Sequence, residues 1–173
     1  MSFRSTRCSD LWVDVYFLGI TFPSGEMQKK LLLEVYNEAG IDPSSVSYVE
    51  LHGTGTSAGD PQEANSVTEV FCSNGRSAPL LVGSTKSNMG HPEPASGLAA
   101  LAKVLIAVHD SAIPANLHFN QPNPDIPGLL DGRLKVTNRL TFGFIWLGDV
   151  GLDLLSLMHS GSTFVYLESS GVT

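Results

Sequence analysis

The sequence predicts an α/β protein with a mixed sheet and buried helices, on three observations. Apolar stretches and helical patterns follow one another in the order strand, loop, helix, strand, loop, helix, which is typical of α/β folds. A polar, glycine-containing loop follows each of two predicted strands, and open α/β sheets place their sites at that end of the strands. The chain has 173 residues, of which 42% are hydrophobic, as expected for one globular core.

The first elements are a strand, a helix and a second strand. Val13 to Phe22 is apolar and ends before a Pro-Ser-Gly turn. Ser24 is placed to cap a helix, and Gly40 is a plausible stop for it. Apolar residues between them recur at helical spacing, namely Leu31, Leu32, Val35, Tyr36 and Ala39. Val46 to Leu51 then predicts a short strand.

The next helix has the clearest start in the chain. Asp60 is predicted as its N-cap, Pro61 as its first residue, and Glu63 as the reciprocal partner in a capping box. Its apolar side would consist of Ala64, Val67, Val70 and Phe71.

A second strand–loop–helix unit follows. Pro79 to Gly83 predicts a strand, and Ser84 to Ser96 a polar loop. Leu98 to Val108 is an almost entirely apolar helix, which predicts burial on most of its sides. An irregular segment, His109 to Gly132, precedes a last short strand at Leu134 to Val136.

Charge and cysteine content narrow the classes of function. The net charge is −7, from 10 basic and 17 acidic residues, and no run of Lys or Arg occurs. This balance argues against a nucleic-acid partner and against docking on an anionic membrane. Asp149 and Asp153 interrupt the apolar stretch 140–158, so we predict no membrane span there. Cys8 and Cys72 have neither disulfide-framework nor metal spacing, which predicts a cytoplasmic protein with free thiols.

The first polar loop begins with His52. Thr54 and Thr56 alternate with glycines in this loop, so the backbone can approach a ligand closely and the hydroxyls can line one side of it. A glycine-rich turn in which His52 merely packs is an equally good interpretation of this loop alone. A phosphate cradle is a third, but the loop lacks the Walker pattern and its lysine.

The second polar loop contains Lys86, Asn88 and His91. His52 and His91 both follow strands, so together they make a stronger case for a site than either does alone. Such a pair can bind a metal, act as acid and base, or jointly polarise a carbonyl. No third ligand lies at convincing spacing, so we predict no metal site. His109 and His118 are interpreted as surface or packing residues.

Two long motifs resemble those of β-ketoacyl synthases. ELHGTGTSAGDPQE, residues 50–63, is similar to the family's first histidine motif. GSTKSNMGHPEPASG, residues 83–97, is similar to its lysine and second-histidine motif. The second motif, together with Asn116-Leu-His-Phe and Pro122-Asn-Pro-Asp-Ile-Pro, most resembles the sequence of the condensing domain of an animal-type fatty acid synthase. The condensing domains of polyketide synthases share both motifs and are the alternative. The resemblance covers roughly 19–139 and leaves 1–18 and 140–173 unmatched.

The resemblance implies a partial thiolase-like fold, the C-terminal half, and a decarboxylative condensation. In this family an acyl group on a cysteine is joined to malonyl on acyl carrier protein, and members form homodimers. His52 and His91 would be the catalytic histidines, with Lys86 orienting or charging the site. Thr54 and Thr56 would line the tunnel for the phosphopantetheine arm, which arrives on the carrier protein, so no cofactor is expected to be bound directly.

The resemblance also predicts a limit. The family's nucleophilic cysteine precedes the first histidine in a small-residue motif, and neither Cys8 nor Cys72 has that context. We therefore expect this chain alone to be inactive in condensation. The alternative from a different class of function is a non-catalytic remnant, which binds a pantetheine ligand or pairs with a full-length subunit.

Overall fold

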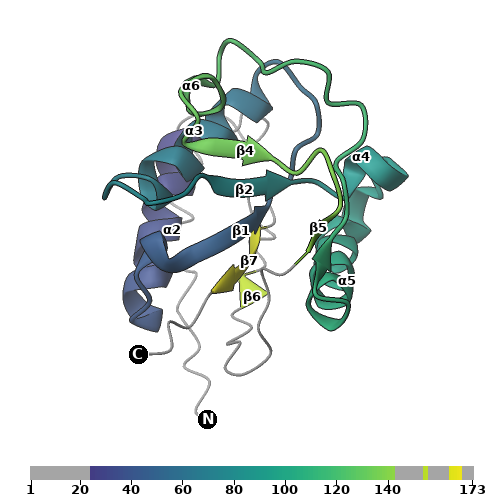
Figure 1. The fold of residues 1–173 in the computed structure, drawn as a ribbon. Helices are drawn as coiled ribbons and strands as arrows, with labels where there is room; N and C mark the ends of the chain where they lie inside the picture. The colour runs from purple at the N-terminus through teal and green to yellow at the C-terminus, as the bar shows by residue number, and fades with distance from the viewer. Residues whose placement is uncertain (1–23, 143–153, 156–163, 169–173) are drawn as a thin grey trace.

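A computed structural model describes residues 24–142, 154–155 and 164–168, and within them the chain forms a mixed sheet flanked by helices (Figure 1). The five strands of this sheet run in the order β4–β2–β1–β7–β6. Their bounds are β1 Val46–Glu50, β2 Leu80–Gly83, β4 Leu134–Val136, β6 Leu154–Leu155 and β7 Phe164–Glu168. The mixed sheet confirms the predicted fold class, whereas the strand expected at Val13 to Phe22 lies outside the described residues.

Strand direction brings the two polar loops together. β1, β2 and β4 are parallel, with Val49 paired to Val82 in register, whereas β7 pairs antiparallel to β1 and to β6. The carboxyl ends of β1 and β2 therefore lie at one edge of the sheet. β6 and β7 come from the segment 140–173, for which the sequence predicts no strand. The proposed division at 18/19 and 139/140 stays a prediction.

Helices cover both faces of the sheet (Figure 1). α2 (Gly25–Ala39) and α3 (Gly59–Phe71) pack on one face against a core that includes Val49 and Val82. α5 (Ser96–His109) packs on the other face, where Tyr48 and Leu81 are buried. Successive strand residues thus point to opposite helical layers, as the two-residue period of a strand requires.

The ends of α2 agree with the sequence. The Ser24 hydroxyl accepts the Met27 N–H at 3.4 Å, and Gly40 follows the helix with φ of 70°. A left-handed conformation of this kind strains residues with a Cβ, which explains the glycine.

The predicted start of α3 is wrong. Ala58 occupies the N-cap and Gly59 is the first helical residue, so Asp60 lies within the first turn. The Asp60 carboxylate accepts the Gly55 N–H at 3.0 Å. Glu63 closes no capping box, because its buried carboxylate accepts hydrogen bonds from the preceding histidine loop instead.

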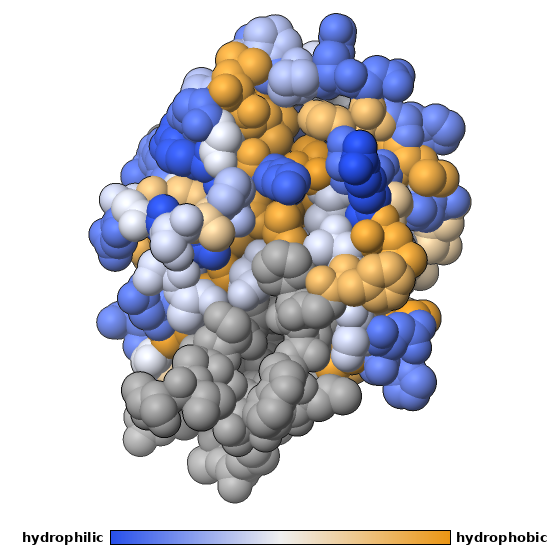
Figure 2. All heavy atoms as spheres, viewed as in Figure 1, coloured by the Kyte–Doolittle hydropathy of each residue, from blue (hydrophilic) through white to orange (hydrophobic). Residues whose placement is uncertain are grey.

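The predicted burial of the apolar helix is also wrong. Within α5, Ala100, Val104 and Ala107 are buried, but Leu98 is 73% exposed and Ile106 is 61% exposed. Only one side of the helix packs against described residues. Figure 2 shows apolar side chains reaching the surface among hydrophilic ones on the face in view.

The segments predicted as loop or irregular, 84–96 and 109–132, contain short elements that the sequence pattern missed. The segment after β2 includes α4 (Lys86–Met89) and a 3₁₀ turn at Glu93–Ala95. The irregular segment before β4 contains β3 (Ala112–Ile113), which pairs antiparallel with β5 (Thr141–Phe142), and α6 (Pro127–Leu130). Elements of two to four residues are too short to produce a clear periodicity.

Candidate functional site

The two loop histidines lie beside each other. His52 follows β1 and His91 follows α4, and their ring centroids are 5.3 Å apart with the ring planes at 85°. The parallel pairing of β1 with β2 explains this proximity, because both loops leave the same edge of the sheet. The structure therefore brings the two predicted catalytic histidines into one site.

Lys86 joins them on the side of His52. Its Nζ lies 3.2 Å from Nδ1 of the half-buried His52 ring. An ammonium group has donors and no acceptor, so Nδ1 accepts and the neutral ring carries its proton on Nε2. Burial first, then the charge of Lys86 and the proximity of His91, lowers the pKa of His52 to about 4. His52 is therefore neutral at physiological pH.

His91 reaches the same tautomer through local contacts. Its Nδ1 accepts the backbone N–H of Glu93 at 3.0 Å. Because a backbone N–H only donates, a neutral His91 also carries its proton on Nε2. The Ser96 hydroxyl lies 3.1 Å from the same Nδ1 and also donates to the Glu93 carbonyl at 2.7 Å. The His91 side chain itself is exposed.

Glu63 holds the backbone of the first histidine loop. Its carboxylate accepts the N–H of His52 at 2.6 Å and that of Gly53 at 2.9 Å. Burial raises the pKa of Glu63 to about 7, against the opposing effect of these two donors. A Cβ on Gly53 would lie 2.9 Å from Cβ of Ser84, and φ of Gly53 is 49°, so this close approach requires glycine.

A cavity of about 500 Å³ is lined in part by Gly53, Thr54, Lys86 and His91, whereas His52 lies outside its lining. Thr54 therefore lies where a ligand arm could contact it. Thr56 is not part of that lining. Its hydroxyl lies 3.4 Å from the Thr54 hydroxyl and accepts the Gly59 N–H at the start of α3.

Several residues of the site had no assigned role in the sequence interpretation. Glu50 and Asn116 accept hydrogen bonds from the backbone at the entry to α4. His118 is exposed, in agreement with its interpretation as a surface residue, and it also contributes to the lining of the cavity. Glu50 carried the one signal available, a carboxylate at the end of a strand whose other residues are uncharged. His109, in contrast, is a surface residue with its side chain 88% exposed, as the sequence indicated.

The described residues offer no other obvious chemistry. Within these ranges, no three His, Cys, Asp or Glu side chains gather as metal ligands. No helix there is both long and apolar enough to cross a membrane. Cys72 is a free, buried cysteine whose thiol contacts the Arg133 carbonyl, and burial raises its pKa.

Known proteins resemble this chain over much of its length. The family described as "Beta-ketoacyl synthase, C-terminal domain" matches residues 13–120. A fatty acid synthase of Anser anser anser is 61% identical over 90 residues, covering 52% of this chain and 25% of that protein. The hybrid PKS-NRPS synthetase pyvA of Aspergillus violaceofuscus is 48% identical over 153 residues, covering 87% of this chain and 4% of that protein.

Solved structures agree with the sequence matches. The ketosynthase from module 6 of the bacillaene synthase of Bacillus subtilis 168 superposes with a TM-score of 0.74 at 33% identity. The match covers 88% of this chain and 28% of that one. The chain thus spans about a quarter of the fatty acid synthase and of the ketosynthase it matches. With its thiolase-like α/β architecture and its family match over more than half of its residues, this chain belongs to the β-ketoacyl synthase family and corresponds to the C-terminal part of a condensing domain.

Proposed function

We propose that the site is the decarboxylation half of a fatty acid synthase condensing domain, in which His52 and His91 stabilise an enolate. The enolate forms when malonyl, held as a thioester on acyl carrier protein, loses CO₂. One observation carries the proposal: two neutral imidazoles lie 5.3 Å apart, each with its Nδ1 already accepting a hydrogen bond.

The tautomers suit this chemistry. Loss of CO₂ leaves an electron pair that delocalises onto the thioester oxygen, and that oxygen needs hydrogen-bond donors already in place. Because both Nδ1 atoms accept, the available ring proton of each neutral histidine is on Nε2. The low pKa of His52, about 4, keeps this donor in one form across the neutral range.

Lys86 and the cavity complete the proposed roles. Lys86 fixes the tautomer of His52 through the 3.2 Å contact and adds a positive charge near the developing oxyanion. The phosphopantetheine arm of the carrier protein would enter the cavity past Thr54. Thr56 would act beside it, through the hydroxyl that contacts Thr54.

The proposal assigns no residue of this chain to acyl transfer. Cys72 is the single cysteine in the described ranges, and its burial in the core just after α3, together with its raised pKa, disfavours the reactive thiolate. We therefore expect CO₂ release without condensation when this chain is supplied with malonyl-loaded carrier protein alone.

The test measures CO₂ release and condensation separately with malonyl-loaded acyl carrier protein. His52→Ala and His91→Ala should each lower CO₂ release by about 100- to 1,000-fold, the usual effect of one lost oxyanion donor. His109→Ala, at the exposed end of α5, is the matched control and should leave the rate unchanged. Release that is insensitive to both active-site substitutions contradicts the proposal. Binding of the pantetheine arm without any release supports the non-catalytic remnant.

A polyketide synthase condensing domain is the second candidate, because the match to the fungal hybrid synthetase covers 87% of this chain. Both candidates use the same half-site and differ in the acyl chain that is extended. Relative affinities for saturated and oxygenated acyl-pantetheine analogues would separate them.

A further inference from the structure

We infer that Glu50 is a positioning residue, which places Lys86 against His52 by holding the backbone of Thr85 from inside the sheet. Glu50 lies at the end of β1, two residues before His52, and its side chain is fully buried. The catalytic consequence of this placement rests on the proposed function, but the placement itself does not.

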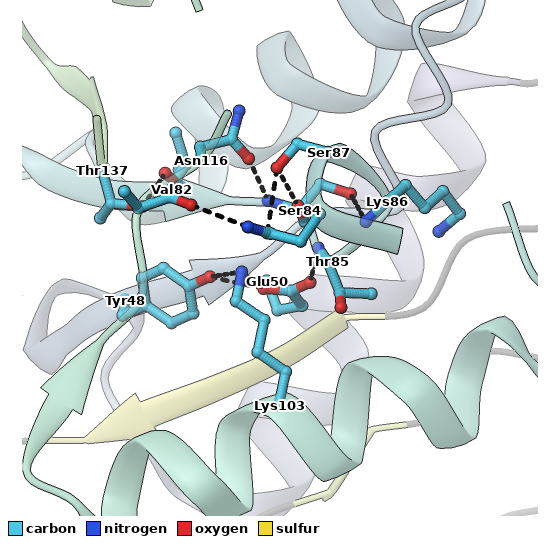
Figure 3. Close-up of polar contacts among 12 residues, drawn as sticks. Tyr48, Glu50, Val82, Ser84, Thr85, Lys86, Ser87, Lys103, Asn116 and Thr137 are labelled. Carbon is cyan, nitrogen blue, oxygen red and sulfur yellow. Dashed lines mark hydrogen bonds and ion pairs between the residues drawn. The ribbon is translucent and has the colours of Figure 1, made fainter. Parts of the chain in front are cut away.

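The Glu50 carboxylate is bonded on both oxygens (Figure 3). Oε1 accepts the Thr85 N–H at 2.5 Å. Oε2 accepts the Tyr48 hydroxyl at 2.5 Å and the ammonium of Lys103, from α5, at 2.7 Å. The Lys103 side chain is 8% exposed, so this ion pair is almost completely removed from water.

Stability alone is a weak explanation for this buried pair. The desolvation of two charges usually offsets their attraction, so well-packed apolar residues of similar volume often give equal or greater stability. Neighbouring Val49 is apolar and fully buried in the same strand. The distinct contribution of Glu50 is directional, because its Oε1 binds the last backbone N–H before Lys86.

The turn from β2 into α4 is fixed from two sides. Asn116 Oδ1 accepts the Ser84 N–H at 2.9 Å, and Glu50 accepts the next N–H, that of Thr85. α4 has four residues, so its own hydrogen bonds define its direction poorly. Ser84 Oγ also accepts the Lys86 N–H at 3.3 Å, and contacts of Ser87 and Asn88 with the backbone of Leu117 and Ala115 hold the rest of α4. The direction in which Lys86 leaves the backbone therefore depends in part on the Glu50 anchor, and the Lys86 Nζ ends 3.2 Å from His52.

A matched pair of double variants isolates the Thr85 hydrogen bond. Glu50→Gln with Lys103→Met removes both buried charges and keeps a side-chain oxygen for the Thr85 N–H. Glu50→Leu with Lys103→Met removes the same charges and that oxygen as well. Thermal unfolding of both variants establishes that the full chain remains folded. Glu50→Asn with Lys103→Met, whose amide is one carbon too short to reach, replaces the leucine variant if that one does not fold.

The readout is the pKa of His52, measured by NMR titration of the imidazole in the full chain. The glutamine variant should retain the depressed pKa of about 4, whereas the leucine or asparagine variant should raise the pKa of His52 as Lys86 moves away, although burial, the largest cause of the shift, still keeps it below 6.5. Equal pKa values in the variants with and without the acceptor would overturn the inference. CO₂ release should fall about tenfold or more only where the acceptor is lost, because small misplacements in a site are costly. The proposed function fails separately, if the unmodified chain releases no CO₂.

Discussion

The two histidines share a tautomer but are held in different ways. His52 is half buried and depends on residues of other elements, Lys86 of α4 at its ring and Glu63 of α3 at its backbone, 34 and 11 residues away. His91 is exposed, and the partners of its Nδ1 lie two and five residues away. One histidine is therefore positioned by the tertiary fold and the other by its own turn. The environment of His52 should respond to distant substitutions, and that of His91 should not.

The largest expected effect comes from removing the anchor of the His52 loop. Glu63→Gln keeps one oxygen but presents an NH₂ group to the second of the two buried backbone donors. We expect the free energy of unfolding to fall by about 1–3 kcal/mol, the typical effect of a buried donor left without an acceptor. Urea titration followed by circular dichroism measures it.

Glu69→Gln provides the control on the same helix. Glu69 is an exposed residue of α3 that pairs with Lys29 at the surface, and such pairs contribute about 0–1 kcal/mol. If both variants lose the same stability, Glu63 does not anchor the loop in the way that the hydrogen bonds indicate.

The pH dependence of stability separates the two buried groups of the His52 loop. Glu63 has a folded pKa of about 7, raised from 4.5. Between these two values the folded chain keeps this proton and the unfolded chain has lost it, so stability falls as pH rises from 4.5 to 7. His52 has a folded pKa of about 4, lowered from 6.5. Between these two values the unfolded chain binds this proton and the folded chain does not, so stability rises as pH increases from 4 to 6.5. The two contributions oppose each other between pH 4.5 and 6.5.

Single substitutions should expose each slope. In Glu63→Gln, the rising contribution of His52 remains, so denaturant midpoints should increase more steeply from pH 4 to 6.5 than in the unmodified chain. In His52→Gln, the falling contribution of Glu63 remains, so midpoints should decrease relative to the unmodified chain from pH 4.5 to 7. The same pH profile in all three chains would show that neither group is perturbed by the fold.

The sequence predicted that His52 and His91 belong to one site because it shows where the two preceding strands end. Val46 to Leu51 and Pro79 to Gly83 are apolar stretches of strand length, and parallel neighbours place the loops that follow at one edge. That reasoning needs no knowledge of side-chain contacts. Lys86 was assigned to the same site through the resemblance, and its Nζ lies 3.2 Å from His52 Nδ1.

The roles of the acidic residues were not predictable in the same way. Glu63 fits a capping box by spacing, but in the fold its carboxylate meets the donors of His52 and Gly53, which come from an adjacent loop. Sequence spacing shows which hydrogen bonds a side chain can form nearby, but it does not show which of the competing donors the folded chain brings to it. Glu50 pairs with Lys103, 53 residues away, so no local pattern indicates the contact. The exposure of α5 likewise depends on what packs against it, which composition cannot specify.

The smallest expected effect tests whether His91 is positioned by contacts within its own turn. Ser96→Ala removes the hydroxyl that lies 3.1 Å from His91 Nδ1 but leaves the Glu93 N–H in place. Because that N–H alone fixes Nδ1 as an acceptor, His91 should keep its proton on Nε2, and CO₂ release should change by less than about threefold. Imidazole ¹⁵N shifts report the tautomer directly. A switch of His91 to the Nδ1–H form would mean that the serine positions this histidine, and that the second loop, too, depends on the packing of α5.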